Sequence, residues 1–189
     1  MRVPTINGDG PVRLAPLEPA QVTEAYVGWL NDPVVTRFTE VSAGQTLQSA
    51  RAYVENTVTS PDSALWAIHF DGTHVGNIRL THIRRRHARA EVALIVGSRP
   101  HWGRGIASAA VVLVTDFAFA SLRLHKLSAG IFAPNVASRR CFEKAGYFHD
   151  AILKDHAWFE GAFCDVLQMA RLAPPSSPSS PHAPTEANR

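Results

Sequence analysis

The chain has 189 residues, 46% of them hydrophobic and 19% charged, which is the composition of one globular domain and not of a disordered chain. Nineteen Lys and Arg against sixteen Asp and Glu give a formal net charge of +3, too small to indicate DNA as a main partner. Two cysteines without a zinc-type cluster, no secretion signal, and no apolar stretch of the roughly 20 residues that cross a bilayer predict a cytoplasmic protein with no metal and no membrane partner.

The first half of the chain predicts one strand, two helices and then three strands. We expect a strand over residues 12–17, a helix over residues 20–30 that Asn31-Asp32-Pro33 ends, and a second helix between Thr46 and Ser60-Pro61. Strands follow over residues 65–70, 75–83 and 89–96. Because Asp71-Gly72 is typical of a hairpin turn, these three strands should form an antiparallel meander.

The second half alternates helices and strands. Apolar residues at helical spacing predict a helix over residues 105–122, followed by a strand over 127–132 and a helix over 135–145 that Gly146 ends. Two strands, over residues 147–153 and 163–171, complete the fold. The order indicates an α/β (α+β) protein with a mixed, mostly antiparallel sheet of about seven strands and about four helices on its faces.

The domain boundaries follow from composition. Residues 11–173 carry the predicted elements, and residues 1–10 form an N-terminal leader. Residues 174–189 contain five prolines and four serines without apolar periodicity, so we expect a disordered tail.

A glycine-rich turn joins the strand over residues 89–96 to the following helix. Gly103 and Gly105 let the backbone approach a ligand closely, and the amides from Gly103 to Ser108 have no helical acceptors. Such amides, with the helix dipole, suit a phosphate or pyrophosphate. The turn lacks the Gly-Lys-Ser/Thr of a P-loop, and antiparallel strands precede it, which argues against a dinucleotide fold. The alternative is a turn that only starts a helix.

A second informative segment begins at Asn135, which is a good helix N-cap. Ser138 lies one turn into this helix on the same side as Phe142. Both side chains could border a ligand, although a purely structural cap would use the same residues.

Together these segments resemble the GNAT N-acetyltransferase superfamily, and within it the RimJ/RimL-type branch. The resemblance covers nearly all of residues 11–172. The matching segments, in chain order, are Leu14-Ala-Pro-Leu17, Trp29-Leu-Asn-Asp-Pro33, Gly76-Asn-Ile-Arg-Leu80, Ala90-Glu-Val92, Trp102-Gly-Arg-Gly-Ile-Ala107, Leu124-His-Lys-Leu127, and Asn135-x-x-Ser138 with Phe142-Glu-Lys-Ala-Gly-Tyr147.

The resemblance implies a GNAT fold that holds acetyl-CoA as cosubstrate, between a fourth and a fifth strand that splay apart. The pantetheine arm would pair with the backbone edge of residues 94–96, and the pyrophosphate would lie on the amides of residues 103–108. The implied cofactor-binding residues are Leu94, Ile95, Val96, Arg99, Trp102, Gly103, Arg104, Gly105, Ile106, Ala107, Ser108, Asn135, Ser138 and Phe142.

Two positions depart from the family pattern. The turn usually begins with Gln or Arg where this chain has Trp102. Many relatives have a tyrosine, proposed to protonate the departing thiolate, at the position of Phe142, which cannot donate a proton.

Because Phe142 cannot donate a proton, the resemblance implies Ser138 as the proton donor, since RimL-type relatives are thought to use a serine at this place. The glutamate of those relatives aligns near Ala157 and is absent here, which leaves Asp155, His156 and Glu91 as substitutes by proximity. We expect Glu91, on the fourth strand, to hold a water or the substrate ammonium; the alternative is that it pairs with a neighbouring arginine.

The acceptor should be set by the N-terminal helices and the loop over residues 31–45. The predicted substrate-binding residues are Trp29, Asn31, Arg37 and Phe38, with the alternative that Trp29 and Phe38 only belong to the core. We expect a small primary amine, such as an amino sugar, and either a monomer or a homodimer. The alternatives are a peptide N-terminus, as in acetylation of a ribosomal protein, and an inactive CoA-binding module. The basic run Arg84–Arg89 is expected to be a solvated hairpin tip; the alternative is a site for a nucleotide or ribosomal RNA.

Overall fold

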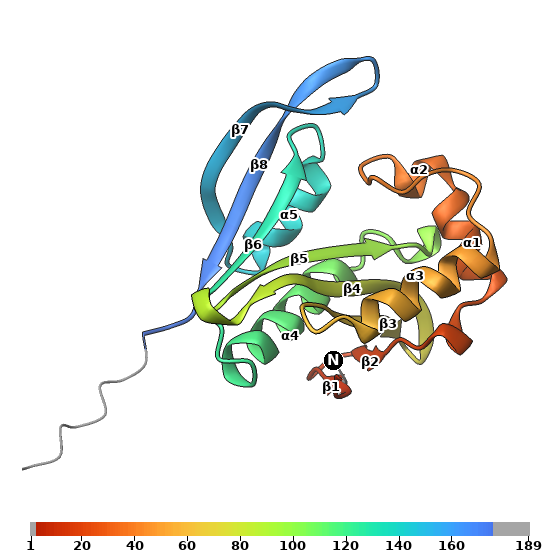
Figure 1. Cartoon of the computed structure of the whole chain (residues 1–189), viewed down its shortest axis with the longest axis horizontal. Helices are drawn as coiled ribbons and strands as arrows, with labels where there is room; N and C mark the ends of the chain where they lie inside the picture. Colours follow the sequence, from red (N-terminus) through yellow and green to blue (C-terminus); the bar gives the residue numbers. More distant parts are fainter. Residues whose placement is uncertain (1–2, 176–189) are drawn as a thin grey trace, which may run out of the picture.

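A computed structural model describes residues 3–175, which form one sheet of eight strands with helices on both faces (Figure 1). The strand order across the sheet is β1-β2-β3-β4-β5-β6-β8-β7. The strands are β1 (Ile6–Asn7), β2 (Val12–Pro16), β3 (Ala64–Phe70), β4 (Thr73–Arg84), β5 (Arg89–Val96), β6 (Lys126–Phe132), β7 (Phe148–Phe159) and β8 (Ala162–Leu172). The α-helices are α1 (Glu24–Asn31), α2 (Pro33–Thr36), α3 (Leu47–Thr59), α4 (Ile106–Ala120) and α5 (Val136–Lys144).

The predicted fold class is confirmed, because among the described strands the neighbours pair antiparallel except for β5 with β6. The extra strand β1 lies in the segment expected to be a leader and pairs with β2. Residues 176–189, most of the predicted tail, lie outside the described residues.

Helix α2 is absent from the elements that the sequence predicts, because Asn31-Asp32-Pro33 indicates only the end of a helix. The Asp32 carboxylate accepts a hydrogen bond from the Val34 amide at 2.9 Å and so caps a new helix. Pro33 occupies the first turn, where its missing N–H costs nothing. The same three residues therefore end α1 and begin α2.

Side-chain alternation on the central strands separates two hydrophobic cores. On β3, Trp66 faces the core that contains Val111 of α4, whereas Leu65 and Ala67 face the core that contains Val54 of α3. The sheet is therefore covered by α4 and α5 on one face and by α1 and α3 on the other.

Strands β5 and β6 separate soon after they begin. Their parallel pairing covers three residue pairs, of which Glu91 with Ser128 is the last. Beyond this point β5 stays paired with β4 up to Val96, and β6 stays paired with β8 up to Phe132. Figure 1 shows the resulting V, with the β7–β8 hairpin on one arm and α1 and α2 on the other. Strands β5 and β6 are the fourth and fifth strands that the sequence predicts, so their expected splay is confirmed.

Within the described part of the chain, no helix has the length and apolar character needed to cross a membrane.

Candidate active site

The glycine turn forms the N-terminus of α4 at the end of β5. Gly103 and Gly105 both have φ of 76°, in the left-handed region that favours glycine. Gly105 is the N-cap of α4, and its carbonyl accepts the first helical hydrogen bond, from the Ala109 amide at 3.0 Å. The amides of residues 106–108 therefore have no acceptor within the helix.

The space in front of this turn fits an anionic group. A Cβ atom built on Gly103 or Gly105 would meet no heavy atom within 4 Å. Open space beside free amides at a helix N-terminus is what the diphosphate of CoA requires. Residues 103–108 are therefore suited to hold it.

The two arginines expected to meet the CoA phosphates both have other contacts. Arg99 lies 3.5 Å from the Asp32 carboxylate, and the Arg104 guanidinium lies over the Phe70 ring, 5.9 Å from its centroid. In this conformation the backbone amides of the turn, and not these two arginine side chains, are free to bind an anion.

Trp102 has a structural role that the amino-acid sequence does not reveal. Its indole Nε1–H donates a hydrogen bond of 2.7 Å to the carbonyl of Val96, the last residue of β5. This bond fastens the turn to the strand end. It also leaves the Val96 carbonyl oxygen one further lone pair that can accept a hydrogen bond.

Helix α5 places its first turn across the V from β5. The Asn135 side chain caps the helix by accepting a bond from the Ser138 amide at 3.1 Å. Ser138 is half-buried, and no described residue makes a hydrogen bond with its hydroxyl. That hydroxyl is therefore available to a ligand.

Phe142 lies in the core instead. Its ring is 2% exposed and packs edge-on against Tyr147, which leaves little surface for the predicted cofactor contact. Burial raises the pKa of Tyr147 to about 12, and its hydroxyl is hydrogen-bonded to Thr115. Tyr147 therefore does not replace the proton donor that a tyrosine at position 142 would supply.

Glu91 lies at the point where β5 and β6 part, on the face of the sheet that carries α1 and α3. The carboxylate Oε2 lies 3.1 Å from Nδ1 of His82. His82 reaches this position because β4 bulges between Thr81 and Arg84, where His82 has φ of 50°. Sequence reasoning missed His82, since a bulge shifts side-chain alternation without a local signal.

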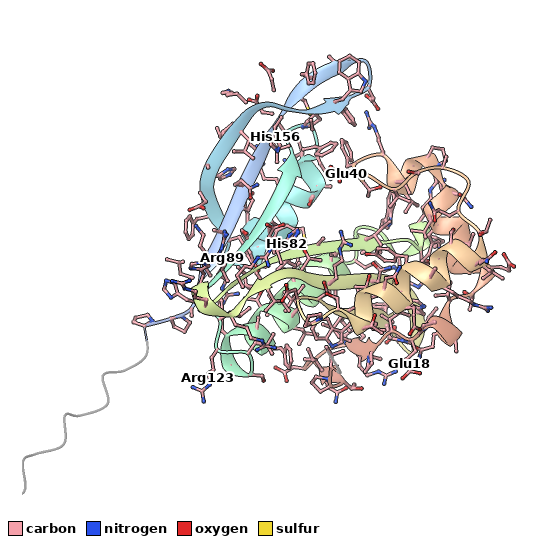
Figure 2. The ribbon with its side chains drawn as sticks, viewed as in Figure 1. Glu18, Glu40, His82, Arg89, Arg123 and His156 are labelled. Atoms are coloured by element: carbon pink, nitrogen blue, oxygen red, sulfur yellow. The ribbon has the colours of Figure 1, made fainter. Side chains whose placement is uncertain are left out.

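A pocket of about 240 Å³ opens beside this pair, and we call it the apex pocket. It is lined by His82, Arg84, Arg89, Ala90, Glu91 and Ser128. Figure 2 shows His82 and Arg89 at the end of the sheet where β5 and β6 begin. The other residues considered as bases, Asp155 and His156, are exposed on the edge strand β7 and do not line it.

Two of the four predicted substrate-binding residues hold the scaffold. The Trp29 ring packs so closely on Gly97 that a Cβ there would lie 2.2 Å from a ring carbon. The Asn31 side chain exchanges two hydrogen bonds of 2.8 Å with the backbone of Gln45 and so closes the loop between α1 and α3.

The other two bridge the arms of the V. Arg37 donates bonds of 2.8 and 3.1 Å to the two carboxylate oxygens of Glu160, at the tip of the β7–β8 hairpin. Phe38 stacks on Phe159 with a centroid distance of 5.1 Å and an interplanar angle of 13°. We call these four residues the clasp. Arg37 and Phe38 lie more than 100 positions before Phe159 and Glu160 in the sequence, so only the fold reveals the clasp.

The clasp carries a titratable carboxylate. Its hydrogen bond with Arg37 lowers the pKa of Glu160 below the ordinary value. The contribution of this pair to the free energy of unfolding is fully present above the ordinary pKa of glutamic acid, and it is lost as pH falls through the lowered pKa.

Replacing Glu160 by glutamine should loosen the loop over residues 37–45, because the bidentate, charge-assisted contact is lost. We expect its backbone amides to exchange hydrogen a few-fold faster at neutral pH. Asp150→Asn, which removes an ion pair elsewhere on β7, should leave these amides unchanged. Unchanged exchange in Glu160→Gln would show that the aromatic stack alone holds the clasp.

A mixed sheet that splays beside a glycine turn capping a helix defines the GNAT class. The family model of the acetyltransferase (GNAT) domain matches residues 12–147 of this sequence. The chain belongs to this acetyltransferase family.

Known relatives agree with this assignment. Over 104 aligned residues the chain is 33% identical to the probable N-acetyltransferase YjcK of Bacillus subtilis. The aligned region covers 55% of this chain and 58% of that protein. The chain thus matches somewhat more than half the length of that relative.

Two solved structures share the fold. Spermidine N-acetyltransferase from Vibrio cholerae, in complex with CoA and spermine, superposes with a TM-score of 0.78 at 18% identity, over 86% of this chain and 95% of that one. Mycobacterium smegmatis RimJ, in complex with CoA-disulfide, gives a TM-score of 0.80 at 20% identity, over 90% and 88%.

Proposed function

We propose that this protein transfers the acetyl group of acetyl-CoA to a primary amine of a small molecule. The observation that carries this proposal is the end of β5–β6 pairing at Glu91 and Ser128, on the strand that leads into the phosphate-type turn at residues 103–108. One strand thus offers a diphosphate site at one end and a carboxylate at the other.

The chain's own groups supply the binding. The amides of residues 103–108 hold the diphosphate, and the free edge of β5 from Leu94 to Val96 orients the pantetheine arm as an added strand. When bound, acetyl-CoA supplies a thioester whose acyl carbon can be attacked by an amine. An amide near Val96 stabilises the negative charge that develops on the carbonyl oxygen.

Two side chains move protons as the nitrogen–carbon bond forms and the carbon–sulfur bond breaks. Glu91 accepts the proton that the amine loses, and His82 holds its carboxylate in place. Ser138 donates to the departing sulfur. A thiol with a pKa of about 8.5 is a good leaving group, so a weak acid suffices there.

Two finer assignments accompany this proposal. We infer that the chain is of the RimJ/RimL type, on the residue motifs of its turn and of α5. We also infer a cytoplasmic location, which is consistent with two cysteines that are both free in the structure.

The proposal is tested by CoA binding followed by thiol release. We expect CoA to raise the melting temperature, because a ligand of the folded state alone stabilises it by mass action. Thiol release from acetyl-CoA should then depend on a small primary amine.

Each alternative has its own outcome. Release with peptide N-termini only would indicate an N-terminal acetyltransferase. CoA binding without release on any amine or peptide would indicate an inactive module, and either result would overturn the proposal.

A further inference from the structure

We propose that the apex pocket takes amine acceptors that also carry an anionic group, a carboxylate or a phosphate. This inference rests on the proposed function and narrows its acceptor class. Its basis is the charge arrangement around Glu91, which differs from what an acceptor bearing only amines would need.

The pocket presents opposite charges on one face of β5. Arg89 and Glu91 are exposed while Ala90 and Val92 are buried, so the two charged side chains share the outward face. At about 3.3 Å per residue their Cα atoms lie roughly 6.6 Å apart. This separation suits a molecule with an amine near one end and an acid near the other.

Two arginines face each other across β4 and β5. Arg84 pairs in register with Arg89, and like charges directly opposite are destabilising in a sheet. Asp62 lies 3.3 Å from Arg84 and offsets its charge. Arg89 forms no ion pair with any described residue. An anion bound in the pocket would neutralise it.

The other end of the pocket suits the amine. Glu91 attracts an ammonium and can take its proton, and Ser128 lies beside it as the last residue of β6 to pair with β5. The pocket has a volume of about 240 Å³, which exceeds the roughly 150 Å³ of a protein cavity that binds benzene. It therefore admits a small solute.

The same charges disfavour a polyamine. With one ammonium at Glu91, a second cationic end would lie against the Arg89 guanidinium, which has no ion-pair partner among the described residues and repels a like charge. An amino acid or an aminoalkyl phosphate meets complementary charge at both ends.

The experiment compares acceptors that differ only in the anion. Ornithine and putrescine differ by a carboxylate, and phosphoethanolamine and ethanolamine differ by a phosphate. We expect kcat/KM to be at least about tenfold higher for the anionic member of one or both pairs, because hydrogen bonds to charged groups are the stronger ones. Which pair responds identifies the anion.

Arg89→Gln should abolish this preference by raising KM for the anionic acceptor about tenfold, with kcat nearly unchanged. Arg86→Gln, an exposed arginine of the same hairpin that does not line the pocket, is the matched control and should keep the preference. Calorimetric titration of the CoA-loaded protein with the same acceptors should give the same order of affinity.

The outcomes separate the two proposals. Equal or better use of putrescine and ethanolamine overturns this inference and leaves the acetyltransferase proposal standing. A preference that persists in Arg89→Gln places the anion elsewhere and also overturns it. No thiol release with any amine, and no acceptor binding by calorimetry, overturns both.

Discussion

Replacing Gly105 by glutamate is expected to lower CoA affinity at least about a hundredfold. The new carboxylate would lie among amides that are directed at the diphosphate. Two unit charges about 4 Å apart at an effective dielectric constant of about 20 repel by about 4 kcal/mol, and each 1.4 kcal/mol is tenfold in affinity. Solvent screening reduces this value, so a hundredfold loss is the conservative figure. Isothermal titration with CoA measures it.

Gly105→Ala is the control for backbone strain. Position 105 has φ of 76°, and a side chain there costs about 1–2 kcal/mol of stability. No neighbour lies within 4 Å of the added Cβ, so sterics add nothing. We expect Gly105→Ala to melt at a lower temperature yet still bind CoA within about tenfold of the parent affinity. If Gly105→Glu binds CoA as well as Gly105→Ala does, the diphosphate does not lie on this turn.

Glu91→Gln is expected to lower kcat by about a hundredfold or more with little change in CoA affinity. General base catalysis contributes about 10²–10⁴ to a rate, and glutamine keeps the shape of the side chain but cannot accept the proton. Steady-state kinetics with a saturating acceptor measure the loss. The variant's kcat should also rise with pH over a wider range, because free amine must then form in solution.

Glu143→Gln provides the matched control for Glu91. This carboxylate lies on α5, where it contacts Arg139 and His149, and it does not line the apex pocket. Its removal should leave kcat within about twofold, as for surface changes away from a site. If Glu91→Gln retains full kcat, another group or a water chain takes the proton, and the assignment of Glu91 is wrong.

Most elements of the fold could be predicted from local patterns. The strands from Ala64 to Val96 follow from side-chain alternation and the Asp-Gly turn, and α4 follows from its apolar stripe. Strand β1 and helix α2 were missed. The first has two residues and depends on its partner strand, and the second depends on a proline that ends one helix and starts another.

The sites differ in the same way. Gly105 and Asn135 could be found because left-handed backbone and helix capping are local requirements of particular residue types. Arg37 and Phe38 were expected to meet the acceptor, but their contacts with the β7–β8 hairpin tip arise only when distant segments fold together.

By itself the sequence determined the class of fold, the glycine turn and the capped helix that borders the V, because each depends on residues close together in the chain. Only the tertiary structure decided that Trp102 fastens the turn to Val96, that the clasp joins the two arms, and that His82 and Arg89 flank Glu91. Those relations depend on strand register and on a bulge in β4, which are set by packing across the whole sheet.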